Sequence, residues 1–450
     1  MNLKLSALSE RLRGSLFFVP MLFVLAGIVL GQVAVSVDVA TSEGADRLPL
    51  GFTSTVESAR QVLSTIAAAT ITVAGIAFSV SLLVIQLASS QYSPRVVHSL
   101  FRDATNKRLM GLVVGTFAYC LVVLRSVRGA VGDGGEPVVP NLSVAIAVLL
   151  GITAILAILY FIDHSARTMD VSQILQSVTD LTIGQARRDW PESDPDAPGR
   201  PAPAQVHEAV PDGPGTLVRF GRSGWVEQLD QDAFLRLAPP GGTVWLGTAP
   251  GRYAVTGSPL CTVWPPAGDS DELTERAHEA VQVGNARTMR QDVAYGLRQL
   301  ADVGIRALSP GVNDPTTAQD AIFHVAAVVA ELLRREPPSP IRVDGDGRRL
   351  LIPETPTHED LVATGFEELR RAAAPHPRVC IYLLESLHLV RQAVEGAGLD
   401  RRAGLLADQA RLLLEAAEAE AGGEDRDQVR RAWEKRFGPD RPGPEGKARG

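Results

Sequence analysis

The loop at residues 309–317, Ser-Pro-Gly-Val-Asn-Asp-Pro-Thr-Thr, carries side chains suited to hold a small polar molecule or an ion. Ser309, Asn313 and Asp314 supply a hydroxyl, an amide and a carboxylate, and Arg306 precedes them. The same residues have a structural explanation. The proline-glycine pair makes a turn, Asn313 tolerates the left-handed conformation, and Asp314 followed by proline starts a helix. We expect a structural loop, with a ligand loop of these four residues as the alternative.

A second set of polar side chains lies in an uncharged stretch between Arg60 and Pro94. Steps of three and four residues place them on one face of a helix, which we call the small-residue stripe: Ser64, Ala68, Thr72, Gly75, Ser79, Leu82, Gln86 and Ser89. A surface facing lipid would carry Leu, Ile, Val and Phe. The stripe therefore predicts close helix packing or, because Gln86 and Ser89 exceed what packing needs, a wetted path for an ion or solute.

Arg125 and Arg128 close the third apolar run of the chain. The simpler explanation is that their side chains extend to lipid headgroups. The alternative is a ring of cations at the outer mouth of an oligomeric pore, which would favour anions.

Motifs of enzymes and metal sites are missing from the sequence. It has no GxSxG, HExxH, Walker A or strand-preceded GxGxxG, and Cys120, Cys261 and Cys380 stand singly. We expect no catalysis, no metal and no cofactor. The 44 basic and 51 acidic residues, with a net charge of -7, are too evenly mixed for a nucleic-acid partner.

Four apolar runs predict helices that cross a membrane, and they contain or adjoin the small-residue stripe and the two arginines. They cover about 15–37, 61–90, 109–124 and 142–162, the third being short for a span at about sixteen residues. Lys and Arg concentrate before the first run and between the second and third. The positive-inside rule therefore places the N-terminus and everything after the fourth run in the cytoplasm.

The chain divides by composition into five parts. We expect a four-helix transmembrane domain with a helical extension at 1–185, a Pro-rich linker at 186–205 and a small β-barrel or sandwich at 206–266. A helical domain at 267–437, with a short hairpin around Asp344, and a disordered tail at 438–450 follow. The fold class is thus an integral membrane α-helical bundle followed by a cytosolic α+β region.

Two blocks, residues 70–95 and 295–315, resemble the bacterial predicted membrane proteins grouped as domain of unknown function family 2254. The resemblance extends from the first span to about residue 420. It implies a protein of the bacterial inner membrane, and it brings no substrate, cofactor or catalytic residue.

Two functions fit these features. The first is an oligomeric channel or transporter-like bundle whose cytosolic domain regulates it, with the lipid bilayer, other copies of the chain and a small ion or solute as partners. The second is a non-conducting membrane scaffold or sensor whose cytosolic domain binds a protein or a small ligand.

Overall fold

The computed structural model describes residues 17–42, 55–91, 104–127, 140–168, 170–193, 203–420 and 422–438. The chain forms two compact units, Met1–Asp170, here called the membrane unit, and Val171–Gly450, here called the C-terminal unit. The division falls before the helix at 171–189, which we expected to extend the transmembrane domain to residue 185. Residues 194–202 of the expected linker and 439–450 of the expected tail lie outside the described residues. The described part of the linker includes helical residues at 186–189 and 203–205.

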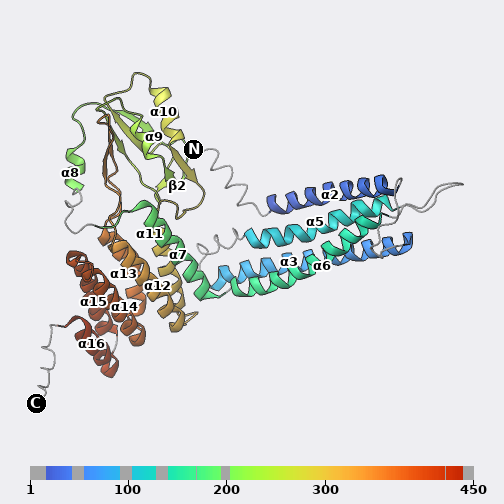
Figure 1. The fold of residues 1–450 in the computed structure, drawn as a ribbon. Coiled ribbons are helices and arrows are strands. Elements are labelled where there is room, and N and C mark those ends of the chain that lie inside the picture. The colour runs from blue at the N-terminus through green and yellow to red at the C-terminus, as the bar shows by residue number, and fades with distance from the viewer. Residues whose placement is uncertain are drawn as a thin grey trace, which may run out of the picture. The chain divides into compact units, whose positions relative to one another are not determined.

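Long helices make up the described part of the membrane unit (Figure 1): α2 (Phe18–Ser42), α3 (Val56–Gln91), α5 (Ala104–Ser126) and α6 (Asn141–Thr168). Each contains an apolar stretch of 22 to 28 residues, long enough to cross a membrane. The prediction of four helices that could span a membrane is confirmed. The sixteen-residue third span is wrong, because the apolar stretch of α5 begins at Thr105 and has 22 residues.

Helix α5 lies at the centre of this bundle and packs against α2, α3 and α6. Its Tyr119 and Val123 are buried together with Leu63 of α3 and Ala147 of α6. The small alanine side chains at many of the contact positions let the helices approach closely.

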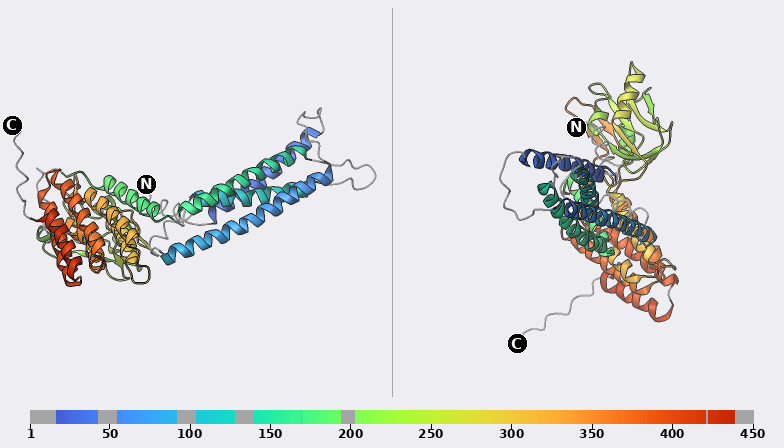
Figure 2. Two further views of the ribbon diagram at one scale, coloured as in Figure 1. Left: turned by 90° about the horizontal axis from the view of Figure 1, so that it is seen from below. Right: turned by 90° about the vertical axis from the view of Figure 1, so that its right-hand side faces the viewer.

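The C-terminal unit is mostly helical, and its helices α12 to α16 pack against one another (Figure 2). Aliphatic side chains at helical spacing, such as Leu297, Ile322 and Leu383, form its core. The helices are α7 (Val171–Asp189), α8 (Pro203–Glu208), α9 (Gln231–Leu235), α10 (Ser270–Glu279), α11 (Val293–Ala307), α12 (Pro315–Leu333), α13 (His358–Ala373), α14 (Pro377–Glu395), α15 (Asp400–Glu420) and α16 (Gly423–Phe437).

Two open sheets share one hydrophobic core in this unit, so the expected barrel is wrong for the described residues. The strands are β1 (Thr216–Arg219), β2 (Gly224–Leu229), β3 (Thr243–Leu246), β4 (Tyr253–Ala254), β5 (Pro259–Trp264), β6 (Val281–Gly284), β7 (Ile341–Val343) and β8 (Arg349–Leu351). Their orders are β1-β5-β3-β8-β7 and β4-β2-β6. The β7–β8 hairpin, predicted near Asp344, adds to β3 by parallel pairing.

The sheets therefore extend beyond the module expected at 206–266. Strand β6 lies within the region 267–437 that we expected to be helical, because α10 already ends at Glu279. Helix α11 begins only at Val293, with Asp292 as its N-cap. Burial of Val283 beside Val226 of β2 outweighs the local helical pattern there.

Candidate functional site

The small-residue stripe lies on an exposed face of α3. Ser64, Thr72, Gly75, Ser79 and Gln86 are all exposed in the protomer, and the side chain of Ser89 lies outside the described residues. The face of α3 buried in the bundle is the neighbouring one, made by Ala59, Leu63, Ala67, Thr70, Ala74 and Ala77. The stripe is therefore not the surface by which α3 packs against its own chain.

The hydroxyl groups of the stripe donate hydrogen bonds within α3 itself. Ser64 Oγ donates to the Gln61 carbonyl at 3.0 Å, Thr72 Oγ1 to Ala68 at 2.8 Å and Ser79 Oγ to Gly75 at 2.9 Å. A Cβ atom added at Gly75 would meet no atom within 4 Å. The stripe thus offers a flat surface that another helix can approach closely, and these three hydroxyl groups are already hydrogen-bonded.

Close backbone contact within the bundle occurs instead between α2 and α5. Gly27 and Gly31 of α2 lie against α5, which carries Gly111 and Gly115 at the same spacing. A Cβ atom added at Gly27 would lie 2.3 Å from the Gly115 carbonyl oxygen, and one at Gly115 would lie 2.7 Å from that of Phe23. Sequence reasoning missed this contact, although glycines four residues apart on two apolar helices were its visible signal.

A carboxylate of α2 caps the start of α6. Asp38 Oδ1 accepts from the Leu142 amide at 3.0 Å, and Oδ2 accepts from the Ser143 amide at 2.8 Å and from Ser143 Oγ at 2.6 Å. The buried Tyr119 hydroxyl donates to the Ser143 carbonyl at 2.9 Å. A negative charge is favourable at a helix N-terminus, so this group of residues joins α2, α5 and α6.

Arg125 lies exposed in the last turn of α5, and Arg128 lies outside the described residues. At the same end of the bundle, Arg60 Nη2 of α3 donates to the Val127 carbonyl at 3.1 Å. Of the two arginines expected at a pore mouth, the structure therefore places only Arg125.

The loop before α12 is built as the structural explanation predicts. Asn313 has a φ of 48°, and Asp314 is the N-cap, accepting from the Thr316 and Thr317 amides at 3.1 Å. A hydrogen bond from the Thr317 hydroxyl lowers the pKa of Asp314. Ser309 Oγ donates to the Arg306 carbonyl at 2.6 Å. The hydroxyl and carboxylate expected to hold a ligand are thus engaged within the loop.

An ion pair between the half-buried Arg287 and the buried Asp292 connects the second sheet to α11. Arg287 Nε lies 2.6 Å from Asp292 Oδ2, and its guanidinium lies over the rings of Trp225 and Tyr295. Burial raises the pKa of Asp292, although the bond from Arg287 opposes that shift. A Cβ atom at Gly251 would lie 2.0 Å from the same carboxylate oxygen, so the site is filled by its own chain. Sequence reasoning missed this pair because residues 287–292 were expected to be helical.

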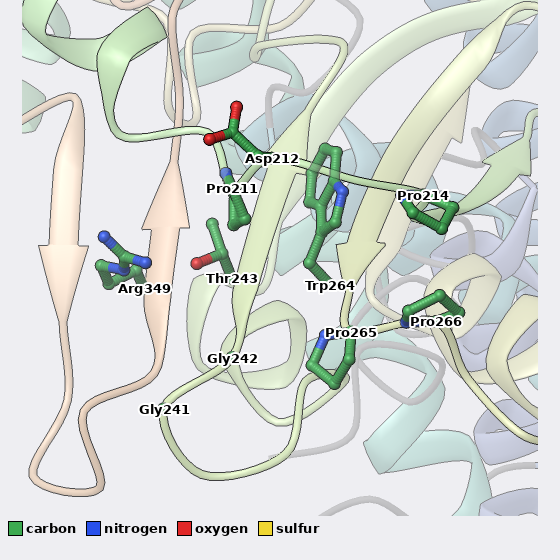
Figure 3. Close-up of a pocket in the computed structure, with 10 residues that line it drawn as sticks. All are labelled: Pro211, Asp212, Pro214, Gly241, Gly242, Thr243, Trp264, Pro265, Pro266 and Arg349. Atoms are coloured by element: carbon green, nitrogen blue, oxygen red, sulfur yellow. The ribbon is translucent and has the colours of Figure 1, made fainter.

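A groove of about 370 Å³, here called the sheet groove, lies against the outer face of the five-stranded sheet (Figure 3). Trp264 of β5, Thr243 of β3 and Arg349 of β8 are register partners and form one row across three strands. Asp212 and the turn at Gly242 lie beside that row. The sequence could not indicate this groove, because its row joins residues about a hundred positions apart.

The described residues contain no group of three His, Cys, Asp or Glu side chains placed to hold a metal ion. All three cysteines are buried as free thiols. Burial raises the pKa of Cys261 and of Cys380 to about 12, so both thiols are protonated at neutral pH.

Comparison with known proteins identifies the family. Residues 13–388 match the model of the family described as Predicted membrane protein (DUF2254). The uncharacterized proteins Rv1290c of Mycobacterium tuberculosis and Mb1321c of Mycobacterium bovis are each 32% identical over 392 residues, covering 86% of this chain and 73% of theirs. No solved structure matches the chain. The protein belongs to the DUF2254 family of predicted membrane proteins.

Proposed function

We propose that the protein acts as an oligomeric channel or transporter-like bundle of the bacterial inner membrane. In this proposal the stripes of α3 from several copies meet, and the C-terminal unit lies in the cytoplasm and regulates the bundle without catalysing a reaction. The observation that supports it is the exposure of a face of α3 whose stripe residues are small or polar except for Leu82.

Other exposed faces of the membrane unit differ from the stripe. On α6 the exposed side chains include Ile152, Ile155, Leu156 and Leu159, with exposed fractions of 52–62%. Such large aliphatic side chains are suited to contact lipid tails, whereas Ser64, Thr72, Gly75 and Ser79 are not. A second copy of α3 covers the stripe better than lipid does.

Gln86 favours a path along the stripe over simple packing. Its side chain is exposed near the end of α3, on the same face as the hydroxyl groups. An exposed amide can replace part of the hydration shell of an ion or a small solute. Because α5 runs antiparallel to α3 in the expected topology, Arg125 and Arg128 would lie at the opposite end of the path from Gln86. Their positive charges would favour anions there.

Two measurements test the proposal on the full chain. Cysteine cross-linking in membranes should join copies through Ser79→Cys and not through Leu156→Cys on α6, since the natural cysteines are buried. Planar-bilayer conductance should then be present in the native protein and in the off-stripe variant Ile76→Leu, and lost in Gln86→Leu. Cross-linking without conductance in the native protein or any variant would contradict the channel hypothesis and would support a non-conducting oligomer.

The second candidate is a non-conducting scaffold or sensor. It is favoured by the internal hydrogen bonds of Ser64, Thr72 and Ser79, which show that these hydroxyls do not need water. In that case Ser79→Leu and Gln86→Leu should be tolerated. The sensor would take its signal through the C-terminal unit.

A further inference from the structure

The sheet groove contains a buried polar atom that its own chain does not satisfy. Thr243 is 1% exposed, and its Oγ1 atom has no hydrogen-bond partner among the residues that the structure describes. Buried hydroxyls in native proteins are almost always hydrogen-bonded. The residue lines the groove, and Figure 3 shows its hydroxyl oxygen on the side toward Arg349. The groove therefore presents a donor and acceptor in its floor.

Arg349 brings a positive charge to the same row. Its backbone amide donates to the Gly242 carbonyl at 2.9 Å, whereas its guanidinium makes no hydrogen bond or ion pair with any residue that the structure describes. The neighbouring Arg348 contrasts with it, because that side chain binds Asp344, Asp346 and the Ala238 carbonyl. Arg349 is thus available to a ligand in the groove.

The rigid walls of the groove indicate a preformed site. Trp264 Nε1 donates to the Gly213 carbonyl at 3.1 Å, which ties one wall to the floor. A Cβ atom at Gly215 would lie 2.7 Å from the same indole ring, so this wall packs directly on it. Residues of the next row, Val244, Val263 and Leu350, are fully buried beneath. The row is therefore held in place by the sheet and by the core.

We propose that the sheet groove binds a small organic carboxylate with a planar or apolar body. The guanidinium fork of Arg349 matches the two oxygens of a carboxylate, and the Thr243 hydroxyl lies next to it in the row. The body of the ligand packs against Trp264 and Pro265. The charge of Asp212 at the edge of the groove repels a doubly charged anion such as phosphate more strongly than it repels a single carboxylate. The volume of the groove fits a molecule of this size.

Benzoate serves as the probe, with saturation-transfer NMR on the full chain in detergent as the measurement. We expect benzoate to bind with a Kd on the order of 1 mM, and its neutral analogue benzamide to bind at least about tenfold more weakly. Absence of benzoate binding at about 10 mM overturns the proposal. So does binding of inorganic phosphate in the absence of benzoate binding.

Two variants and a control locate the site. Arg349→Gln should weaken benzoate binding at least about tenfold, and Thr243→Val about threefold, with the melting temperature of the Thr243 variant unchanged or raised. The exposed Arg222, outside the groove, gives the matched control Arg222→Gln, which should bind as the native protein does. Native affinity in both groove variants would overturn the assignment. The result is independent of conduction through α3.

Discussion

Two small-residue surfaces of the membrane unit have opposite surroundings. At the α2–α5 contact, a methyl group added at Gly27 would collide with a backbone oxygen at 2.3 Å, whereas one added at Gly75 in the stripe of α3 would meet nothing within 4 Å. Both surfaces are suited to close helix approach. The comparison shows that small residues at helical spacing identify a contact surface but do not specify which helix packs against it. In this protein one surface is used within the protomer and the other is exposed.

The largest expected effect comes from placing the same side chain on each surface. Gly115→Leu should lower the free energy of unfolding by more than about 3 kcal/mol, because backbone atoms of α2 cannot move aside cheaply. Gly75→Leu, its matched control, should change the stability of the protomer by less than about 0.5 kcal/mol. Thermal unfolding in detergent under conditions that keep the protein monomeric measures both. Equal destabilisation by the two changes would contradict the contrast.

A smaller effect is expected where α2 holds α6 through side chains. Asp38→Ala removes an acceptor of three hydrogen bonds and should cost about 2 kcal/mol of stability. Asp163→Ala, near the other end of α6, removes only the exposed ion pair with Arg167 and should cost less than about 0.5 kcal/mol. The same unfolding measurement compares them. A larger loss of stability from Asp163→Ala than from Asp38→Ala would contradict this expected order.

The stripe itself should affect association more than folding. Ser79→Leu should reduce cross-linking through a Ser64→Cys reporter about tenfold, because a bulky side chain keeps two copies of α3 apart. Ser79→Ala retains a small side chain and should cross-link as well as the parent. Unchanged cross-linking in the leucine variant would mean that copies do not meet along the stripe.

The smallest expected effect is a pH dependence that leaves both surfaces untouched. Burial lowers the pKa of His358, and Arg402 lowers it further. The hydrogen bond between His358 Nε2 and the Arg335 carbonyl, at 2.9 Å, opposes this shift, as do Glu336 and Glu359. The folded chain therefore binds fewer protons than the unfolded chain below about pH 6.5, and stability is lost as the pH falls.

Melting temperatures at pH 7.5 and 5.5 measure this dependence. We expect a decrease of a few degrees on acidification. His358→Gln should make that decrease smaller, and His324 and His388, whose pKa values are lowered in the same direction, should account for the remainder. An identical decrease in the variant would exclude His358 as a contributor.

The sequence predicted most of the helices and the loop before α12. Apolar runs gave the four spans to within a few residues, except at α5, where Lys107 and Arg108 made the run look shorter than the helix. The geometry of Asn313 and Asp314 followed from their local conformational preferences. Of the predicted barrel or sandwich at 206–266, the barrel was wrong, because the two sheets are open. Strand β8, about a hundred residues after β3, pairs with it and extends one sheet beyond that module.

Membrane insertion, helix positions and the capped loop depend on short-range properties, which are hydrophobicity, periodicity and backbone preference. The sequence by itself therefore determined them. The tertiary structure alone decided that Gly27 and Gly115 meet, that the stripe of α3 is exposed, and that Thr243, Trp264 and Arg349 form one row. These features depend on which distant segments pack together, and that choice is made by the burial of the whole chain.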